Sequence, residues 1–372
     1  FLISYMAEWI KKQLKLKKIT NLLKDQVSLG LAMSKLKKFP QIEVAILKTI
    51  NHDDNVPDED CVQSLLLIGR SSRMHVAHCV SIIMDRLNKS HNWVVVIKCL
   101  IIIHRCLFEG GFMFQDQISI HPAQGGRNYL NLSRFRDSSS LFTWEMSGWI
   151  RWYAKFIEQW IQTSIVIGDF LDMKMMDEDS VMYGEKLKGM INKHLIAEIL
   201  SLNELLQEVC GWETGKVVMD HPLVKEGLRL ATFVILKAYR EIKLRLKEIQ
   251  SRIKTLVQSQ VLELLKVCDK LSANSMMLTY FFEMCEDPLL QQNRTVCREV
   301  LFSHYELMQL KEALRLASTE KHSTKLDIVD IGIHPPSSIQ SLSMRYPKPS
   351  ANGWEVKRGG SMSDFNYYET FL

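Results

Sequence analysis

The sequence predicts an all-α fold in which about ten or eleven helices stack into an elongated array. Two observations in the 372 residues support this: apolar residues recur at steps of three and four, and no stretch sustains a period-two alternation. The chain is 47% hydrophobic and 24% charged, so it has enough apolar material to bury a core. No fixed-period repeat is visible, so the helices stack without a repeat code.

Two long stripes and one fully apolar segment are the clearest helical signals. The stripe in 185–210 places seven apolar residues on one face of a single long helix, and a similar stripe runs through 222–250. The segment 92–109 is apolar almost all round, which predicts a central buried helix. Prolines 57, 222 and 288 precede new stripes, as is typical of first helical turns. The expected helices span residues 8–28, 42–51, 58–70, 73–88, 92–109, 141–173, 185–210, 222–250, 255–271, 273–286 and 291–317.

The stripes stop near residue 318. The last 55 residues contain four of the nine prolines and nine serines, a composition that favours disorder. We therefore expect a helical domain over 8–317 and a short disordered tail over 318–372. The eight cysteines include no CxxC pair, so we expect buried, reduced thiols rather than a disulfide framework.

Positive charge is concentrated at the front of the chain. Residues 1–48 contain ten lysines against three acidic residues, a net charge of +7, whereas the remaining residues total −2. Such a front suits an anionic partner, for which nucleic acid and a membrane surface are the candidates, although a solvated lysine face would have the same composition. No RNA-binding aromatic motif, zinc finger or basic zipper is present, so we expect no nucleic-acid partner.

The first expected helix carries its own apolar stripe. Trp9, Leu16 and Leu23 are seven residues apart, with Ile19 and Val27 beside them. The stripe could dip into lipid as an interfacial helix, or it could pack on the following helices while lysines coat the exterior. We favour packing, which still leaves a lysine face free for phosphates.

Catalytic chemistry and metal binding are not expected. His75, His78 and Cys79 have a spacing that could hold a metal, but their apolar neighbours favour a buried or rim histidine pair. His104 and Arg105 end the most apolar helix, where cations complement the helix dipole. No phosphate-binding loop or nucleophile elbow occurs, so we predict no enzyme, no cofactor, no catalytic residue and no metal site. Every apolar run meets a charge before the ~18 residues that a membrane span requires.

Strings of residues over roughly 8–315 resemble plant ANTH-domain clathrin assembly proteins. They are, in order, Lys24-Asp25-Gln26, Ser28-Leu29-Gly30-Leu31-Ala32, Glu43-Val44-Ala45-Ile46-Leu47-Lys48, His52-Asp53-Asp54, Asn92-Trp93, His104-Arg105, Leu130-Asn131-Leu132-Ser133, Asp137-Ser138-Ser139 and Trp149-Ile150-Arg151. The resemblance implies a right-handed α-solenoid (an ENTH/ANTH-like superhelix) that binds phosphatidylinositol 4,5-bisphosphate and helps assemble clathrin coats in endocytosis. It also implies that late helices bind a vesicle SNARE. The implied location is cytoplasmic, peripheral on clathrin-coated pits and vesicles, and on the Golgi.

The lipid-binding motif of that family is only partly matched. The motif is a lysine, nine residues, and then mostly cations; Lys48 fits its first position, but Asp58, Glu59 and Asp60 follow. These acids complement the dipole of a helix that begins after Pro57, yet they should repel a phosphate headgroup. We therefore expect membrane binding to depend on total lipid charge. The residues expected to bind the membrane are Lys18, Lys24, Lys35, Lys37, Lys38 and Lys48. The alternative is a helical interaction scaffold with a degraded phosphoinositide site.

The tail carries only weak peptide motifs. It lacks the Asp-Pro-Phe and Asn-Pro-Phe triplets that family tails repeat. Residues 326–330 form a degenerate clathrin box with a charge in its second place, and residues 368–371 have the outline of a tyrosine sorting signal. Chance is the favoured explanation of both matches, so clathrin binding is inferred from the resemblance alone.

Overall fold

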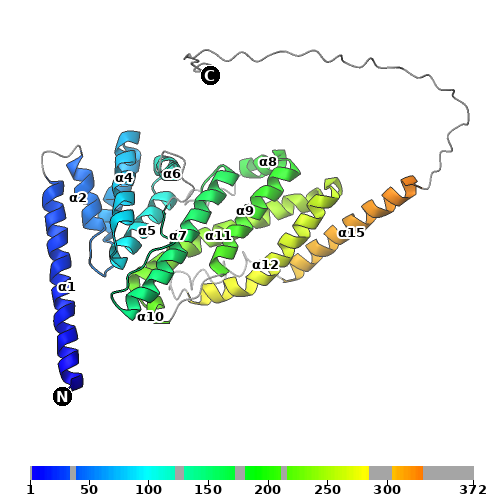
Figure 1. The fold of residues 1–372 in the computed structure, drawn as a ribbon. Helices are drawn as coiled ribbons and strands as arrows, with labels where there is room; N and C mark the ends of the chain where they lie inside the picture. The colour runs from blue at the N-terminus through cyan, green and yellow to red at the C-terminus, as the bar shows by residue number, and fades with distance from the viewer. Residues whose placement is uncertain are drawn as a thin grey trace, which may run out of the picture. The chain divides into compact units, whose positions relative to one another are not determined.

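The structure, a computed structural model, describes residues 2–33, 39–121, 130–171, 181–210, 216–284 and 304–329. These residues form helices and no strand, so the expected all-α solenoid is confirmed (Figure 1). The elements are α1 (Leu2–Ala32), α2 (Pro40–Thr49), α3 (Glu59–Leu66), η1 (Leu67–Arg70), α4 (Arg73–Lys89), α5 (Trp93–Phe108), α6 (Phe112–Ser119), α7 (Leu141–Ile167), α8 (Val181–Gly189), α9 (Asn192–Cys210), α10 (Lys216–Met219), α11 (Pro222–Ser251), η3 (Ile253–Thr255), α12 (Gln258–Met284) and α15 (His304–Val329). None of the helices in the described ranges is long and apolar enough to cross a bilayer.

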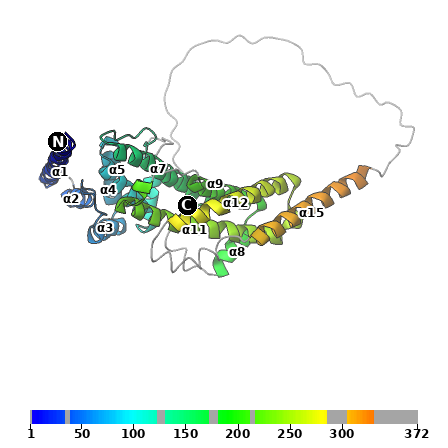
Figure 2. The ribbon, with the colours of Figure 1, turned by 90° about the horizontal axis from the view of Figure 1, so that it is seen from below.

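The core is built around α5. All 16 of its residues are buried, as its apolar sequence predicts, and α3, α4, α6, α7 and α11 pack around it. The stack continues from α7 to α9, and α9 in turn contacts α11 and α12. At the other end α2 lies between α1 and the remaining helices in both views (Figures 1 and 2). This compact unit spans residues 1–325.

Helix starts follow the capping signals in the sequence. The side chains of Asp58, Ser72, Asn92 and Ser140 accept backbone N–H groups of the first turns of α3, α4, α5 and α7. Pro222 occupies the first turn of α11 as expected. Pro57 lies one residue before the cap of α3 rather than in its first turn, and position 288 is outside the described residues.

The predicted single helix over 185–210 is wrong, because the chain breaks into α8 and α9. The guanidinium of Arg252, which follows α11, donates hydrogen bonds to the backbone oxygens of Leu187, Lys188 and Met190. The last carbonyls of a helix lack the N–H partners of a further turn, and the distant arginine supplies donors to them, while the N–H of Met190 also donates to the oxygen of Leu187. The five apolar residues from Leu195 to Val209 in the predicted stripe are nevertheless buried.

The predicted break near residue 272 is also wrong, since α12 is continuous from 258 to 284. Ser272 donates to the oxygen of Cys268 at 2.9 Å and accepts from Lys311 of α15 at 3.0 Å. These two hydrogen bonds satisfy the hydroxyl of Ser272, so this polar residue does not interrupt the helix.

Two other helices differ from the expected ones. The last described helix, α15, runs to Val329, beyond the expected end at 317, and α6 was not expected. Residues 285–303 and 330–372 lie outside the described residues.

The expected free thiols are confirmed for the described cysteines, although Cys61 is half-buried rather than buried. Cys79, Cys99, Cys106 and Cys268 are buried and free. Burial raises the pKa of Cys79 and of Cys99 to about 12, which keeps both thiols protonated and unreactive.

Candidate functional site

Helix α1 is attached to the molecule along one narrow face. Helix α1 contacts α2, and among its described side chains Asn21, Asp25, Ser28 and Leu29 are half-buried and Ala32 is buried at 1% exposure. Every residue between 8 and 20 whose side chain is described is exposed. The first half of α1 therefore has no packing partner among the described residues.

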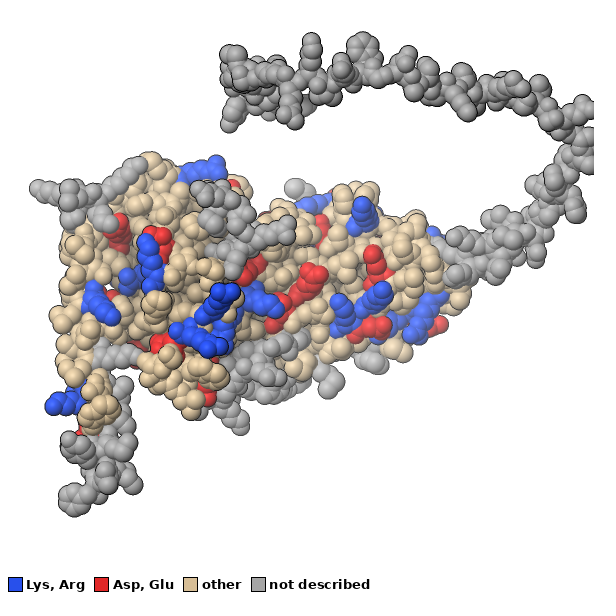
Figure 3. All heavy atoms as spheres, viewed as in Figure 1, with Lys and Arg blue, Asp and Glu red and all other residues tan. Residues whose placement is uncertain are grey.

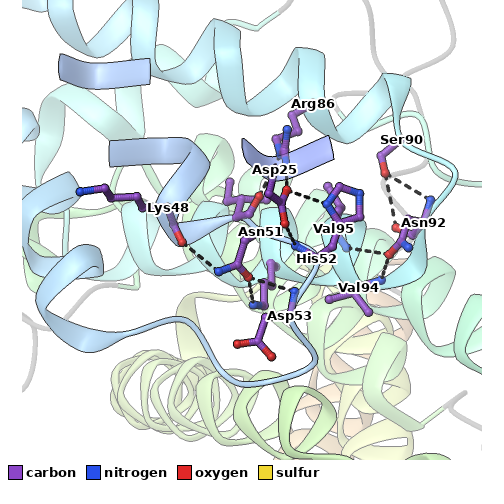
Figure 4. Close-up of polar contacts among 12 residues, drawn as sticks. Asp25, Lys48, Asn51, His52, Asp53, Arg86, Ser90, Asn92, Val94 and Val95 are labelled. Atoms are coloured by element: carbon purple, nitrogen blue, oxygen red, sulfur yellow. Dashed lines mark hydrogen bonds and ion pairs between the residues drawn. The ribbon is translucent and has the colours of Figure 1, made fainter. Parts of the chain in front are cut away.

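Asp25 fixes α1 to the body of the protein (Figure 4). Its carboxylate accepts the backbone N–H of His52 at 2.9 Å and lies 2.7 Å from the Nδ1 atom of that ring, while Arg86 Nη2 is 3.5 Å away. Burial acts to raise the pKa of Asp25, but the hydrogen bonds from His52 and the charge of Arg86 outweigh it, so the pKa is lowered. The carboxylate is therefore ionised when it holds α1, α4 and the α2–α3 loop together.

The apolar stripe of α1 is exposed, so the expectation that it packs on the next helices is wrong. The exposed fractions are 57% for Trp9, 50% for Leu16, 54% for Ile19, 60% for Leu23 and 61% for Val27. At about 3.6 residues per turn, these positions lie on the side of the helix opposite the face that carries Asp25 and Ala32. Attachment through one face leaves the apolar stripe directed away from the molecule.

The described lysines of this region are exposed, and the charge of Lys18 acts on the carboxylate of Asp53. Lys12, Lys15, Lys18 and Lys24 of α1 and Lys48 of α2 are exposed, and none forms an ion pair within the part of the chain that the structure describes. On the rest of the face drawn in Figure 3, basic and acidic side chains alternate over the surface. Lys35, Lys37 and Lys38 lie outside the described residues, so their role stays a prediction.

The three acidic residues at the start of α3 have different surroundings. Asp58 caps the helix and accepts the N–H of Cys61 at 3.1 Å. Glu59 accepts hydrogen bonds from Arg105 at 2.7 and 3.0 Å, and these bonds are the main reason that its pKa falls to about 2. Asp60 is exposed, and its carboxylate has no partner among the described residues. The predicted interaction with the helix dipole therefore does not by itself explain the lowered pKa of Glu59, to which Arg105 contributes most.

A buried lysine lies beneath this surface. Lys98 of α5 is 1% exposed, and its ammonium donates to the side-chain oxygen of Asn51 at 2.6 Å. Burial lowers its pKa to about 8, although Asp53 and Asp54 oppose the shift. The sequence signal for this residue is its position as the only charge in the first three turns of an otherwise apolar helix, and no role is predicted for it from that signal.

The histidines have structural surroundings. His75 and His78 contact the ring of Phe39 at centroid distances of 4.7 and 5.2 Å, and His75 lines an open hollow of about 490 Å³. His104 is fully buried against Tyr153, and burial lowers its pKa to about 3, so the expected cation near the end of α5 is Arg105 and not His104. No group of residues in the described ranges has the composition and geometry of a metal site.

Comparisons with known proteins identify the family to which this helical stack belongs. The ANTH domain model matches residues 41–296. The Arabidopsis thaliana "Putative clathrin assembly protein At4g40080" is 32% identical over 231 residues, which cover 62% of this chain and 63% of the relative. "Probable clathrin assembly protein At4g32285" of the same plant is 34% identical over 152 residues, covering 41% and 24%.

A third Arabidopsis thaliana relative, "Putative clathrin assembly protein At1g14910", is 25% identical over 276 residues, covering 73% of this chain and 40% of the relative. The matched part of the chain thus spans less than two thirds of the length of each of these relatives. The family model alone covers more than half of the chain and coincides with the stack from α2 through α12. This chain belongs to the ANTH domain family.

Proposed function

We propose that this protein is a clathrin-coat assembly adaptor that is recruited to anionic membranes through α1 and the neighbouring lysines. The names of its relatives as clathrin assembly proteins support the adaptor role. In this proposal the protein acts in endocytosis from the cytoplasmic side, peripheral on coated pits and vesicles, and performs no catalysis.

The observation that supports membrane binding most directly is the exposed apolar stripe of α1. An amphipathic helix with aromatic and aliphatic residues on one side and lysines beside them can lie in the bilayer interface. Lys15 flanks the stripe on one side and Lys24 on the other, whereas Lys18 lies on the face that carries Asp25. Each cation near an anionic leaflet contributes about 1 kcal/mol. Pairing of two α1 stripes in a dimer would instead bring these unpaired lysines together, which disfavours that use of the surface.

Vesicle co-sedimentation tests the proposal with three membranes: neutral, phosphatidylserine-containing, and phosphatidylinositol 4,5-bisphosphate-containing vesicles of equal total charge. The wild-type protein should bind both anionic membranes and not the neutral one. The double variant Leu16→Gln, Leu23→Gln keeps the charge but removes the apolar contact, so affinity should fall by at least about tenfold.

Leu316→Gln is the matched control, because Leu316 is 56% exposed on α15 and lies far along the chain from α1. This variant should bind as the wild type does. Equal loss in the control and the α1 variant would contradict an interfacial role for α1.

The acidic start of α3 favours a second candidate, a helical scaffold whose phosphoinositide site has degraded. In that case protein partners rather than lipid would recruit the molecule. Absence of vesicle binding by the wild-type protein, together with retention of a partner protein, would support this alternative.

Clathrin and a vesicle SNARE are the proposed protein partners. The degenerate clathrin box begins at Leu326 in the last described turn of α15, and the exposed side of this helix carries Tyr305, Met308 and Leu316. Retention of the full-length protein on immobilised clathrin terminal domain tests the first partner. A SNARE-helix pulldown with the variant Met308→Gln, which should lose retention if α15 is the docking face, tests the second.

A further inference from the structure

A segment without helical structure, residues 134–139, lies along the first half of α7. The guanidinium of Arg151 donates to the backbone oxygen of Phe135 at 2.9 Å, and the hydroxyl of Ser147 accepts the backbone N–H of Asp137 at 2.8 Å. Residue numbers rise along the segment while those of its partners fall along the helix. The segment is therefore fixed antiparallel to α7.

Burial alternates along this segment. Phe135 and Asp137 are each 8% exposed. The residues between and beside them, Arg134, Arg136 and Ser138, are exposed. Such alternation places the two arginine side chains on one side of the segment, away from the core. Neither arginine has an acidic partner among the described residues, so both charges are available to an anion from outside.

The neighbouring surface of α7 is apolar. Leu141 and Trp144 are three residues apart and therefore share one side of the helix, where they are 75% and 54% exposed. One turn further along the same side lies Gly148. A Cβ atom built at this glycine would meet only the guanidinium of Arg151, at 3.7 Å. The surface beside the Trp144 ring is therefore not covered by a side chain from the next turn.

The arginines and the apolar side chains form one continuous surface. Arg151 follows Trp144 by seven residues, so it lies on the same side of α7, and it holds the segment that carries Arg134 and Arg136. We call these two arginines together with Leu141 and Trp144 the α7 surface. Tryptophan and arginine are enriched among the residues that supply most of the binding energy at protein interfaces.

The charges around Trp144 distinguish a peptide from a bilayer as the partner. Arg134 and Arg136 lie on one flank, whereas Glu145, which is half-buried, is rotated by about 100° toward the other flank. A flat anionic bilayer would meet both flanks, and the carboxylate would repel it. A peptide can place its own carboxylates against the arginines alone, so its charge complements this surface better.

We propose that the α7 surface binds a short acidic segment of a partner protein. Carboxylates of the segment pair with Arg134 and Arg136, and a bulky apolar side chain beside them packs on Trp144. This interaction goes beyond the proposed membrane recruitment and does not depend on it, because none of these residues belongs to α1.

Fluorescence anisotropy with the full-length protein tests the proposal. The probes are labelled peptides in which a run of glutamates precedes a pair of leucines by one to four residues. At least one should bind, and its counterpart with serines in place of the leucines should bind at least about tenfold more weakly. Trp144→Ala should also weaken binding by at least about tenfold. Ile165→Ala is the matched control, because Ile165 is equally exposed, at 54%, near the other end of α7.

A second arm tests the arginines. The double variant Arg134→Gln, Arg136→Gln should weaken peptide binding by about fivefold at ~0.1 M ionic strength, and its affinity should depend less on salt than that of the wild type. Neutralising Lys193 and Lys254, which are exposed at the start of α9 and in η3, changes the net charge equally and should leave peptide binding unchanged.

Three results would overturn the proposal. The first is that the wild-type protein binds none of the peptides, and the second is that Trp144→Ala and Ile165→Ala have the same effect. The third is that Trp144→Ala loses binding to anionic vesicles, which would assign the α7 surface to lipid. Failure of the wild-type protein to bind vesicles would instead contradict the proposed membrane recruitment and leave the peptide result unaffected.

Discussion

The carboxylate of Glu59 lies at a surface that is expected to meet anions, but its charge is already paired with Arg105. Its partner Arg105 is 8% exposed and also pairs with Glu109 at 2.5 Å, so the ionic contact ties the start of α3 to the end of α5. Glu59 itself is 60% exposed, which limits the strength of the pair through solvent screening.

Glu59→Gln should destabilise the protein by about 1 kcal/mol, because a charged acceptor is lost from a partly buried arginine. Urea unfolding measures this change. Glu263→Gln is the matched control and should be neutral, since Glu263 is exposed on α12 beyond its first turn and has no partner among the described residues.

The same pair has a defined pH dependence. The pKa of Glu59 is about 2 in the folded protein against an ordinary value of 4.5, so its contribution is complete above pH 4.5 and is lost as the pH falls toward 2. An unfolding midpoint that changes equally with pH in the wild type and in Glu59→Gln would contradict this assignment.

His104 affects stability in a higher pH range. The Nδ1 atom of the ring lies 3.0 Å from the hydroxyl of Tyr153, the ring centroid is 4.9 Å from that of Trp160, and the positive charges of Arg229 and Arg105 act on the ring. Because burial lowers its pKa to about 3 from 6.5, the unfolded chain takes up a proton that the folded chain refuses, and stability falls as the pH drops from 6.5 toward 3.

Between pH 7 and pH 5 the wild type should therefore lose stability with a slope of up to about 1.4 kcal/mol per pH unit below the unfolded pKa. His104→Gln keeps an acceptor for Tyr153 and should flatten this slope, whatever its absolute stability. Urea unfolding at several pH values measures the slope, and an unchanged slope in the variant would rule out His104 as its source.

At the scale of single elements, α1 differs from every helix that packs in the core. Its attachment depends on a few half-buried residues and on the carboxylate of Asp25, whereas α5 and α11 are held by continuous buried faces. A helix with so small a buried face can loosen without unfolding of the rest.

Asp25→Ala should therefore raise hydrogen exchange of the α1 amides by at least about tenfold, because a hydrogen-bonded charge is worth roughly 1.5–3 kcal/mol, while α5 and α11 remain protected. Exchange measured by mass spectrometry resolves these helices. Gln26→Ala, an exposed neighbour on the same helix, should leave exchange unchanged. Equal protection of α1 in Asp25→Ala and the wild type would contradict the proposed attachment.

At the scale of the whole molecule, charge is distributed unevenly between the first residues and the body. The body pairs many of its charges, as in Lys155 with Glu208 and Arg229 with Glu226, both within 2.8 Å. The lysines of α1 have no such partners among the described residues, so their field extends into solvent and is sensitive to salt.

Raising NaCl from about 0.1 M to about 0.3 M should weaken binding to phosphatidylserine vesicles by at least about tenfold, since the screening length falls from about 10 Å to roughly 6 Å. A variant with Lys12, Lys15, Lys18 and Lys24 all changed to Gln should bind more weakly and show a smaller salt dependence. Neutralising Lys193 and Lys254, which are remote in sequence, is the control. Salt-independent binding of the wild type would contradict an electrostatic contribution.

The sequence alone was sufficient for the fold class, for the buried helix α5 and for the apolar faces of α9 and α11, because burial of one helix face leaves a local period of about 3.6 residues. The lysines at 18, 24 and 48 are exposed, and their predicted role in membrane binding stays a prediction. Only the tertiary structure decided the rest. Arg252 ends α8 from beyond α11, and Arg105 engages Glu59 across 46 positions of sequence. The tertiary structure also decided the direction of the α1 stripe, because the amphipathic pattern identifies the apolar side of a helix but does not show whether other elements cover that side. That depends on which face other elements occupy, and here α2 and His52 occupy the polar one.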